Sequence, residues 1–267
     1  MQYDPVKRSL GSFFNRSVFL RQTFYRLLDL LLLRAWHIHK ALRKLPGSPA
    51  SLSILDAGAG FGQYSFWMQK HFKQCSIQAV DVKEEQVEDC NNFFNRIGAE
   101  NVRFEVGDLV TFKKENNFDL VLCVDVMEHI EQDVQVLKNF CASLRPGGML
   151  LISTPSDKGG SDAHDESSES FIEEHVRNGY NIDEMKNKLK EAGFSKSEIK
   201  YSYGAPGKIS WRLSMKYPIL LAGVSKIFLL VLPFYYVIVY PMAFILNYFD
   251  VRMEHREGTG LIVKAWK

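Results

Sequence analysis

The chain has 267 residues, of which 46% are hydrophobic and 24% charged, with a formal net charge of +2. This length suits one large domain or a domain with an elaboration, and the composition is ordinary for a globular protein. The near-neutral charge gives no general argument for a nucleic-acid partner. The cysteines form no C-x-x-C pair, and the N-terminus shows no clean signal peptide. We therefore expect a cytosolic protein with reduced thiols at Cys75, Cys90, Cys123 and Cys141.

Residues 17–45 carry apolar side chains at the spacing of one helix face, which predicts a leading helix. Those positions are Phe24, Leu27, Leu28, Leu31 and Leu32. Basic residues fill much of the remainder, namely Arg16, Arg21, Arg26, Arg34, Lys40, Arg43 and Lys44. The helix is either a cap over a ligand cleft or a basic amphipathic helix on an anionic membrane surface. Pro46-Gly47-Ser48-Pro49 then breaks the chain.

Residues 54–65 read Ile-Leu-Asp-Ala-Gly-Ala-Gly-Phe-Gly-Gln-Tyr-Ser and join a buried strand to a helix that begins near Gln63. The glycines alternate, at Gly58, Gly60 and Gly62. Glycine permits a positive φ and a close ligand approach, and the N-terminus of the following helix presents N–H groups to that ligand. A dinucleotide fingerprint would need its third glycine at the position of Gln63. The pattern is instead G-x-G-x-G, with Asp56 two residues before it.

Strand and helix signals alternate after this turn, which predicts a mostly parallel sheet with helices on both faces. The first five strands are expected at 52–56, 76–81, 102–106, 118–124 and 149–154, with helices at 63–72, up to about 97, and 131–143. A helix capped by Asn181 and ending at Glu191, a strand at 199–203 and a last strand at 260–266 complete the pattern. Ligands of such sheets bind at the carboxyl ends of the strands.

Two acids follow strands at positions that suit a nucleoside. Asp81 ends the second strand, 21 residues beyond Gly60, where a carboxylate can accept both ribose hydroxyls. Asp108 follows the third strand, where a carboxylate can accept from an adenine amino group. Each acid alone is equally consistent with a strand-end or N-cap role.

Together with the glycine turn, Phe118-Asp119-Leu120-Val121 and Leu144-Arg145-Pro146-Gly147-Gly148, these acids resemble the class I S-adenosylmethionine (SAM) methyltransferases over residues 50–155. The resemblance implies a Rossmann-like α/β fold with a mostly parallel seven-stranded sheet and SAM as the cofactor. It also implies cofactor contacts from Asp56, Gly58, Ala59, Gly60, Asp81, Val82, Asp108 and Leu109.

Asp125, Glu128 and His129 would share one face if a helix begins at Asp125. The stretch resembles the E-x-x-E-H segment of the ubiquinone-pathway O-methyltransferases, with Asp125 in place of the first Glu. In that family these side chains are thought to bind a divalent ion, which would lower the pKa of an acceptor hydroxyl. The alternative is acids at a helix N-terminus beside a His that lines the cleft. We expect Glu128 and His129 to be catalytic, with His129 a possible metal-free general base, and leave the metal open.

Two later segments are candidates for the substrate side. Residues 156–170, with His164 and Asp165, predict a mobile loop over the cleft. Residues 173–180 contain His175, Arg177 and Tyr180, which either meet substrate or form a solvated turn.

Residues 227–249 contain no charge, lie between Lys226 and Asp250, and are numerous enough to span a bilayer. A single crossing would separate the last strand from its sheet, so the insertion at 205–256 must leave and return on one side. We predict a helical hairpin broken near Pro233 and Pro241, dipping into one leaflet or lying in the interface. A lid or a dimer surface is the alternative.

The sequence thus predicts a leading helix or cap (1–49), a SAM-binding core (50–204), an apolar helical insertion (205–256) and a final core strand (257–267). We expect O-methylation of a lipophilic phenol, quinone-type or lipid-linked acceptor by a cytoplasmic protein, peripheral or monotopic on the inner face of a membrane. C-methylation, a SAM-binding module without turnover and a nicotinamide oxidoreductase are alternatives. Nucleic acid is not expected as a substrate, because the basic leading helix lacks interleaved aromatic residues.

Overall fold

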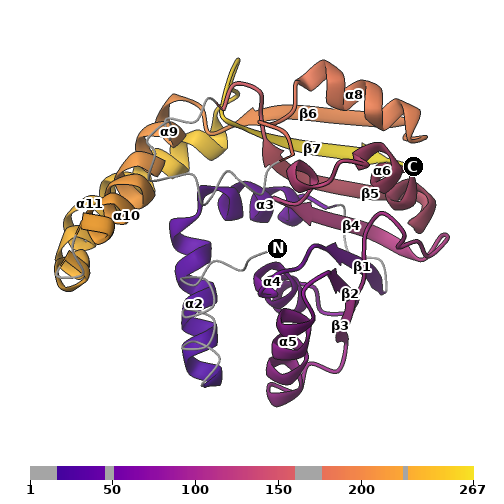
Figure 1. Ribbon diagram of the computed structural model, residues 1–267, viewed down its shortest axis with the longest axis horizontal. Helices are drawn as coiled ribbons and strands as arrows, with labels where there is room; N and C mark the ends of the chain where they lie inside the picture. The colour runs from indigo at the N-terminus through magenta and orange to yellow at the C-terminus, as the bar shows by residue number, and fades with distance from the viewer. Residues whose placement is uncertain (1–16, 46–50, 160–175, 225–227) are drawn as a thin grey trace.

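The computed structural model describes residues 17–45, 51–159, 176–224 and 228–267. A seven-stranded sheet lies at its centre, in the order β3-β2-β1-β4-β5-β7-β6 (Figure 1). The strands are β1 (Leu52–Ala57), β2 (Cys75–Asp81), β3 (Val102–Val106), β4 (Phe118–Val124), β5 (Leu144–Pro155), β6 (Lys196–Ser202) and β7 (Gly260–Trp266). The first five are mutually parallel, and β7 runs antiparallel to both β5 and β6. The predicted mostly parallel seven-stranded sheet is confirmed.

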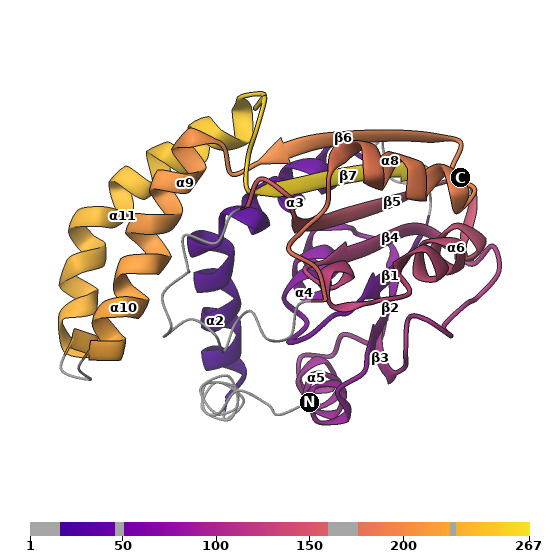
Figure 2. The same ribbon diagram turned by 45° about the horizontal axis from the view of Figure 1, so that its top comes forward.

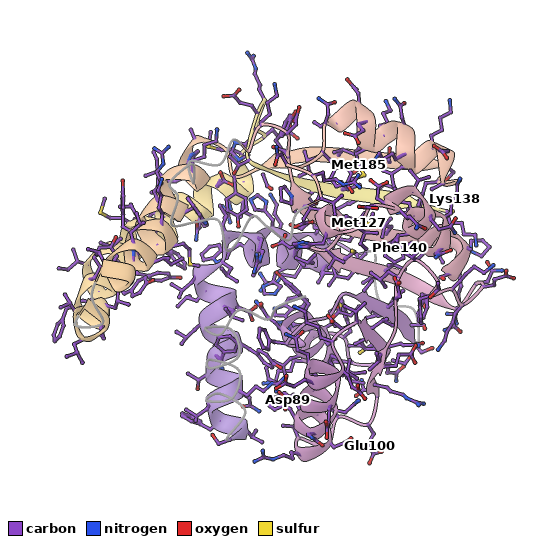
Figure 3. All side chains as sticks on the ribbon, in the orientation of Figure 1. Asp89, Glu100, Met127, Lys138, Phe140 and Met185 are labelled. Atoms are coloured by element: carbon purple, nitrogen blue, oxygen red, sulfur yellow. The ribbon has the colours of Figure 1, made fainter. Side chains whose placement is uncertain are left out.

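Side chains that alternate along the central strands pack into two separate cores, one on each face of the sheet. Ile54 packs with α3 (Leu33–Arg43), α4 (Gln63–His71) and α5 (Glu84–Arg96), whereas Leu55 packs with α6 (Asp133–Ser143) and α8 (Ile182–Glu191). This is the two-residue period of a strand that is buried on both faces. Figure 3 shows Met127, Phe140 and Met185 of the second core between these helices and the sheet.

The leading segment forms two helices, α2 (Val18–Leu31) and α3, so the prediction of one continuous helix was wrong. Leu32 has an extended backbone, with φ −88° and ψ 110°. The break lets α3 lie on the sheet, where Ile38 and Leu42 are buried, while Tyr25 of α2 contacts the rings of α4 and α5. Tertiary packing therefore outweighs the local helical pattern.

The insertion between β6 and β7 is a helical hairpin, as predicted. Its outgoing arm contains α9 (Ala205–Trp211), a π-helical turn η3 (Arg212–Lys216) and α10 (Tyr217–Val224), and its returning arm is α11 (Phe228–Arg252). Figures 1 and 2 show the two arms side by side, projecting away from the sheet. The predicted break near the prolines was wrong, because Pro233 and Pro241 both lie inside α11. A proline removes one helical hydrogen bond, and here a packed second arm supports the helix around it.

Two boundaries differ from the sequence prediction in an informative way. β5 begins at Leu144 rather than near residue 149, because Leu144 already pairs with Phe118 before the Arg145–Gly148 turn. β6 covers Lys196–Ser202, somewhat earlier than expected. The predicted loop residues His164, Asp165 and His175 and the Pro46–Pro49 break lie outside the described residues.

Candidate active site

The glycine turn after β1 takes the left-handed backbone that its sequence predicts. Gly58, Gly60 and Gly62 have φ values of 74°, 51° and 76°. A Cβ at Gly58 would lie 2.2 Å from Val126 Cγ2, so packing alone requires this glycine. A Cβ at Gly60 would meet nothing within 4 Å. The bare face of Gly60 therefore opens on free space at the carboxyl end of β1, where a ligand can approach the backbone.

Asp81 at the end of β2 is fixed against this turn. The Gly60 N–H donates to Asp81 Oδ2 at 2.8 Å, and the Lys83 N–H donates to Asp81 Oδ1 at 3.0 Å. The N–H groups of Gly58 and Ala59 both donate to the Val80 carbonyl. The ends of β1 and β2 are thus locked together, with one carboxylate held over the glycine turn.

The remaining predicted nucleoside contacts differ in accessibility. Val82 is 53% exposed beside Asp81, and Asp108 is exposed, with its Oδ1 accepting from the Val110 N–H at 2.8 Å. Leu109 is only 4% exposed and its side chain belongs to the second core. Because β2 and β3 pair as far as Asp81 and Val106, their carboxyl ends are adjacent. Val82 and Asp108 can therefore face a ligand with their side chains, and Leu109 only with its backbone.

Asp56 is buried at the end of β1, where the Ser65 hydroxyl donates to its Oδ2 at 2.6 Å. Burial raises the pKa of Asp56 to about 6, opposed by this hydrogen bond and assisted by the charge of Asp81. A buried carboxylate beside another carboxylate gains from a nearby cation.

The turn after β4 does not form the predicted helix. Asp125 has a left-handed φ of 52°, and the one-turn 3₁₀ helix η1 (Met127–His129) begins two residues later. Asp125, Glu128 and His129 therefore do not share a helix face, and that prediction was wrong. The reason lies outside the segment, since the Asp125 N–H donates to the Ser153 carbonyl and its carboxylate pairs with Arg34 of α3. Within the described ranges, no three Asp, Glu, His or Cys side chains gather as a metal site.

Glu128 is 1% exposed, and its Oε2 accepts from the Thr154 hydroxyl at 3.0 Å. Burial, followed by the charge of Asp125, raises the pKa of Glu128 to about 8. The buried site therefore favours the protonated form of this carboxyl group. His129 is half-buried directly after it, at the end of η1.

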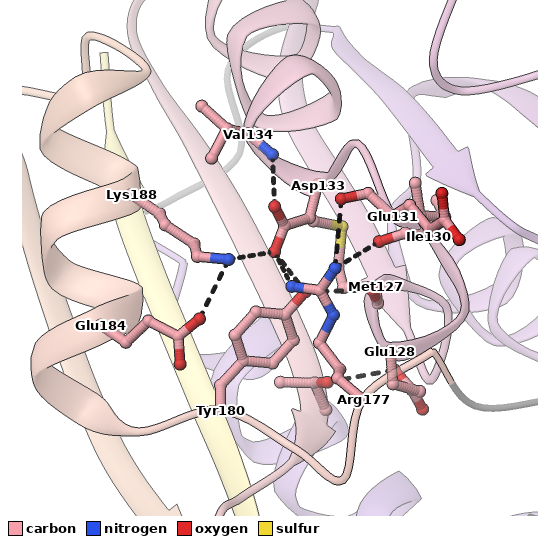
Figure 4. A network of polar contacts seen from close by, with 11 residues as sticks. Met127, Glu128, Ile130, Glu131, Asp133, Val134, Arg177, Tyr180, Glu184 and Lys188 are labelled. Atoms are coloured by element: carbon pink, nitrogen blue, oxygen red, sulfur yellow. Dashed lines mark hydrogen bonds and ion pairs between the residues drawn. The ribbon is translucent and has the colours of Figure 1, made fainter.

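A buried network around Asp133 holds η1 in place (Figure 4). The Tyr180 hydroxyl lies 2.9 Å from Asp133 Oδ2 and 3.0 Å from the Met127 carbonyl, and Lys188 Nζ donates to Asp133 at 2.6 Å. Arg177 pairs with the same carboxylate and donates to the Ile130 carbonyl at 2.7 Å. Tyr180 is fully buried, so a substrate contact from Tyr180 is not formed, whereas Val176 and Asn178 of the same segment are exposed, as in the expected solvated turn. The single sequence signal for Asp133 was its position as an acid near the start of the helix predicted at 131–143.

Helix α3 connects this side of the sheet to the base of the hairpin. The Arg34 N–H donates to the Tyr203 hydroxyl at 2.9 Å, and the Tyr203 N–H donates to Asp250 Oδ1 at 3.2 Å. His37, one turn beyond Arg34, lies 2.9 Å from the same oxygen of Asp250. In the sequence, Arg34 was one basic residue among seven, so its contact with Asp125 could not be found there.

Helix α2 covers the outer side of the glycine turn. Arg21 Nη2 donates to the Phe61 carbonyl at 3.0 Å, the Tyr25 hydroxyl donates to the same oxygen, and Gln63 Nε2 donates to Asp29 at 2.7 Å. Arg21 is only 3% exposed. These contacts favour the cap over the helix on a membrane surface, since Arg21 faces the core.

Comparison with known families matches residues 49–200, more than half of the chain, to a methyltransferase domain. The chain belongs to this family. It carries a class I, SAM-dependent methyltransferase domain on the sheet described above. The nicotinamide alternative is therefore wrong.

Curated relatives match the core only in part. The chain is 24% identical over 147 residues to (S)-coclaurine N-methyltransferase of Papaver somniferum, covering 55% of this chain and 39% of that protein. It is 28% identical over 102 residues to a ubiquinone biosynthesis O-methyltransferase of Coxiella burnetii, covering 38% of this chain and 42% of that protein. The chain thus spans about two fifths of the length of these relatives. The names of the two relatives differ in the atom methylated.

The fold also matches a solved structure over nearly its whole length. Phosphoethanolamine N-methyltransferase 2 of Haemonchus contortus, in complex with S-adenosyl-L-methionine, superposes with a TM-score of 0.63 at 17% identity. The match covers 97% of this chain and 60% of that chain. At this identity the similarity shows the shared fold.

Proposed function

We propose that this methyltransferase transfers the methyl group of SAM to a hydroxyl oxygen of a lipophilic small molecule, a phenol, quinone precursor or lipid-linked acceptor, met at a membrane surface. The observation that carries the proposal is the open face of Gly60 beneath Asp81, beside the turn that holds Glu128 and His129. Free backbone surface, acids suited to a cation and the imidazole of His129 then lie at the carboxyl ends of neighbouring strands.

The cofactor residues divide between its two ends in this proposal. Asp56 and the turn of Gly58, Ala59 and Gly60 face the methionine end, where the raised pKa of Asp56 fits the positive charges of the sulfonium and ammonium groups. Asp81 accepts the ribose hydroxyls with the lone pairs that its two backbone donors leave available. Val82, Asp108 and the Leu109 backbone flank the adenine. SAM supplies the activated methyl group, so the protein must mainly align the reactants and exclude water.

On the acceptor side, we assign His129 the role of the base that takes the hydroxyl proton as the oxygen–methyl bond forms. Glu128 is too buried to reach an acceptor, so we assign it a positioning role instead of the direct one expected from the sequence. Its bond from Thr154 and the network around Asp133 fix the turn on which His129 lies. The reaction needs no metal in this scheme.

A lipophilic acceptor is supported by the hairpin, which joins the site through Arg34, Tyr203 and Asp250. An exposed apolar surface on an element whose base is linked to the acceptor side favours an acceptor that partitions into lipid. We therefore infer a cytoplasmic protein, peripheral or monotopic on the inner face of a membrane.

Methyl transfer from carbon-13-labelled SAM tests this proposal. The enzyme is incubated with vesicles made from a membrane lipid extract and, separately, with soluble phenols, and products are identified by mass spectrometry and NMR. We expect an O-methyl carbon in an organic-phase product. A methyl carbon attached to a ring carbon would show C-methylation. Absence of any product, with SAM binding intact by calorimetry, would show a SAM-binding module.

A further inference from the structure

The returning arm of the hairpin carries a continuous apolar stripe that faces away from the protein. Exposed side chains recur at the spacing of one helix face, at Leu230 (75%), Phe234 (73%), Val237 (75%), Ile238 (73%), Ile245 (55%) and Tyr248 (40%). Residues Leu230–Arg252 form a helix that is long and apolar enough to span a bilayer, by length and composition alone. Little of its most apolar part is buried inside the protein. The stripe runs for roughly 27 Å along α11. Soluble proteins rarely expose an apolar patch larger than roughly 600 Å² unless the patch is an interaction surface, and a stripe that runs along a whole helix is a candidate for such a surface.

Three hydroxyl groups fix the register of the two arms. Ser210 Oγ donates to the Ala243 carbonyl at 3.1 Å, Tyr235 to the Leu213 carbonyl at 2.7 Å, and Tyr236 to the Ser214 carbonyl at 2.8 Å. The inner side of α11 is thereby covered by the outgoing arm. Its outer stripe contacts no described part of the chain that would bury it.

The outgoing arm supplies positive charges beside residues 228–249 of α11, which carry none, whereas Asp250 and Arg252 lie at the base of the hairpin. Lys208, Arg212 and Lys216 recur every four residues, and the register places them beside residues of α11 that carry no charge. The amphipathic unit is therefore the hairpin as a whole, with an apolar stripe on the returning arm and basic residues over 208–216 of the outgoing arm, which ends in the apolar helix α10. This pairing suits an interface between lipid chains and anionic headgroups.

We propose that the hairpin lies in the plane of an anionic membrane, with the α11 stripe among the upper acyl chains along its whole length. This inference rests on the proposed function and adds the orientation of the contact. It differs from an insertion that leads with the tip of the hairpin. Only residues 217–224 separate Lys216 from the end of the outgoing arm, about 12 Å of helix, whereas the exposed stripe on α11 is more than twice as long.

A spanning hairpin is also disfavoured by these charges. Full insertion of α11 would carry Arg212 and Lys216 of the packed arm into the hydrocarbon, where charged side chains are costly. An in-plane hairpin keeps Arg212 and Lys216 at the headgroup level.

Depth-dependent quenching of an environment-sensitive dye tests the orientation. Cys75, Cys90, Cys123 and Cys141 are buried, so a cysteine introduced at Leu230→Cys, Ile238→Cys or Tyr248→Cys can be labelled selectively with NBD. Vesicles contain phosphatidylcholine with phosphatidylglycerol and a nitroxide at carbon 5 or carbon 12 of the acyl chain. We expect all three labels to brighten and to be quenched more strongly from carbon 5. Lys190→Cys on α8 serves as the aqueous control.

The other outcomes overturn the proposal. Deep quenching at Leu230→Cys with an aqueous signal at Tyr248→Cys would show tip-first insertion. No response to vesicles, with dimer cross-linking through the same positions, would show a second copy of the chain on the stripe. We expect Arg212→Gln with Lys216→Gln to weaken binding to anionic vesicles roughly 30-fold. SAM calorimetry on each labelled protein separates a failure of the membrane contact from a failure of the proposed methyl transfer.

Discussion

Leu122 of β4 and Leu230 of α11 are leucines in long apolar runs, yet Leu122 is fully buried and Leu230 is 75% exposed. In the sheet, helices on both faces cover the apolar strands, so the apolar side chains are buried by other parts of the same chain. In the hairpin, one arm covers only one side of the other. The same residue types thus stabilise the fold in one region and remain available to an external partner in the other.

Replacing these two leucines gives the largest expected contrast. Leu122→Ala should lower the free energy of unfolding by about 3–5 kcal/mol, because it removes buried contacts and leaves a cavity. Leu230→Ala should change it by less than about 0.5 kcal/mol, as for most surface substitutions. Urea unfolding measures both. A cost at Leu230→Ala equal to that at Leu122→Ala would mean that the hairpin surface is buried in solution.

Asp81→Ala should weaken SAM binding, whereas a substitution in the hairpin should not. Loss of an ionised acceptor costs about 3 kcal/mol when two hydrogen bonds are removed, which corresponds to roughly 100-fold weaker SAM binding by calorimetry. Asp119→Ala is the matched control, because this carboxylate accepts from the Ser53 N–H at the opposite end of the sheet. Phe234→Glu in the hairpin should leave SAM affinity within about twofold. Equal affinity of Asp81→Ala and the native protein would remove Asp81 from the cofactor site.

Glu128 should make stability fall as the pH rises. The raised pKa means that the folded state favours the protonated carboxyl, so this contribution is complete below about pH 4.5 and is lost as the pH rises towards about 8. Between pH 6 and 8, Glu128→Gln should gain about 2 kcal/mol relative to the native protein. Urea unfolding at both values checks this, with Glu191→Gln at an exposed site as the control. A difference that does not change with pH would contradict the raised pKa.

The smallest expected effect concerns the cohesion of the hairpin. Tyr236→Phe removes the bond to the Ser214 carbonyl, worth about 1 kcal/mol, and should lower hydrogen-exchange protection in the hairpin about fivefold while the strands of the sheet stay unchanged. Tyr248→Phe, whose ring contacts Arg252 and Phe249, is the control. A loss of protection spread over the whole chain would mean that hairpin and core unfold together.

The sequence was sufficient for the parts of the fold that depend on local pattern. Buried apolar runs located β3 and β4 to the residue, and the glycine turn took the predicted backbone because only local sterics decide it. The last strand also lies at the predicted residues, as β7 covers Gly260–Trp266.

The features that could not be predicted depend on contacts between distant residues. The break at Leu32 reflects packing on the sheet, and the left-handed Asp125 is held by Ser153 and by Arg34, which lies 91 residues earlier. The buried carboxyl of Glu128 accepts from Thr154 on β5, 26 residues later in the chain. The continuity of α11 through two prolines depends on the second arm, which the local proline signal does not include.

The central claim about the mechanism, that His129 takes the acceptor proton during methyl transfer, is tested most directly by His129→Ala. Calorimetry should give a SAM affinity within about twofold of the native protein, because the proposal assigns this residue to the acceptor and not to the cofactor. Transfer of the labelled methyl group to the organic-phase acceptor should fall at least about 100-fold, the usual effect of removing a general base. Equal transfer rates with equal SAM binding would contradict the assignment of His129 as the base.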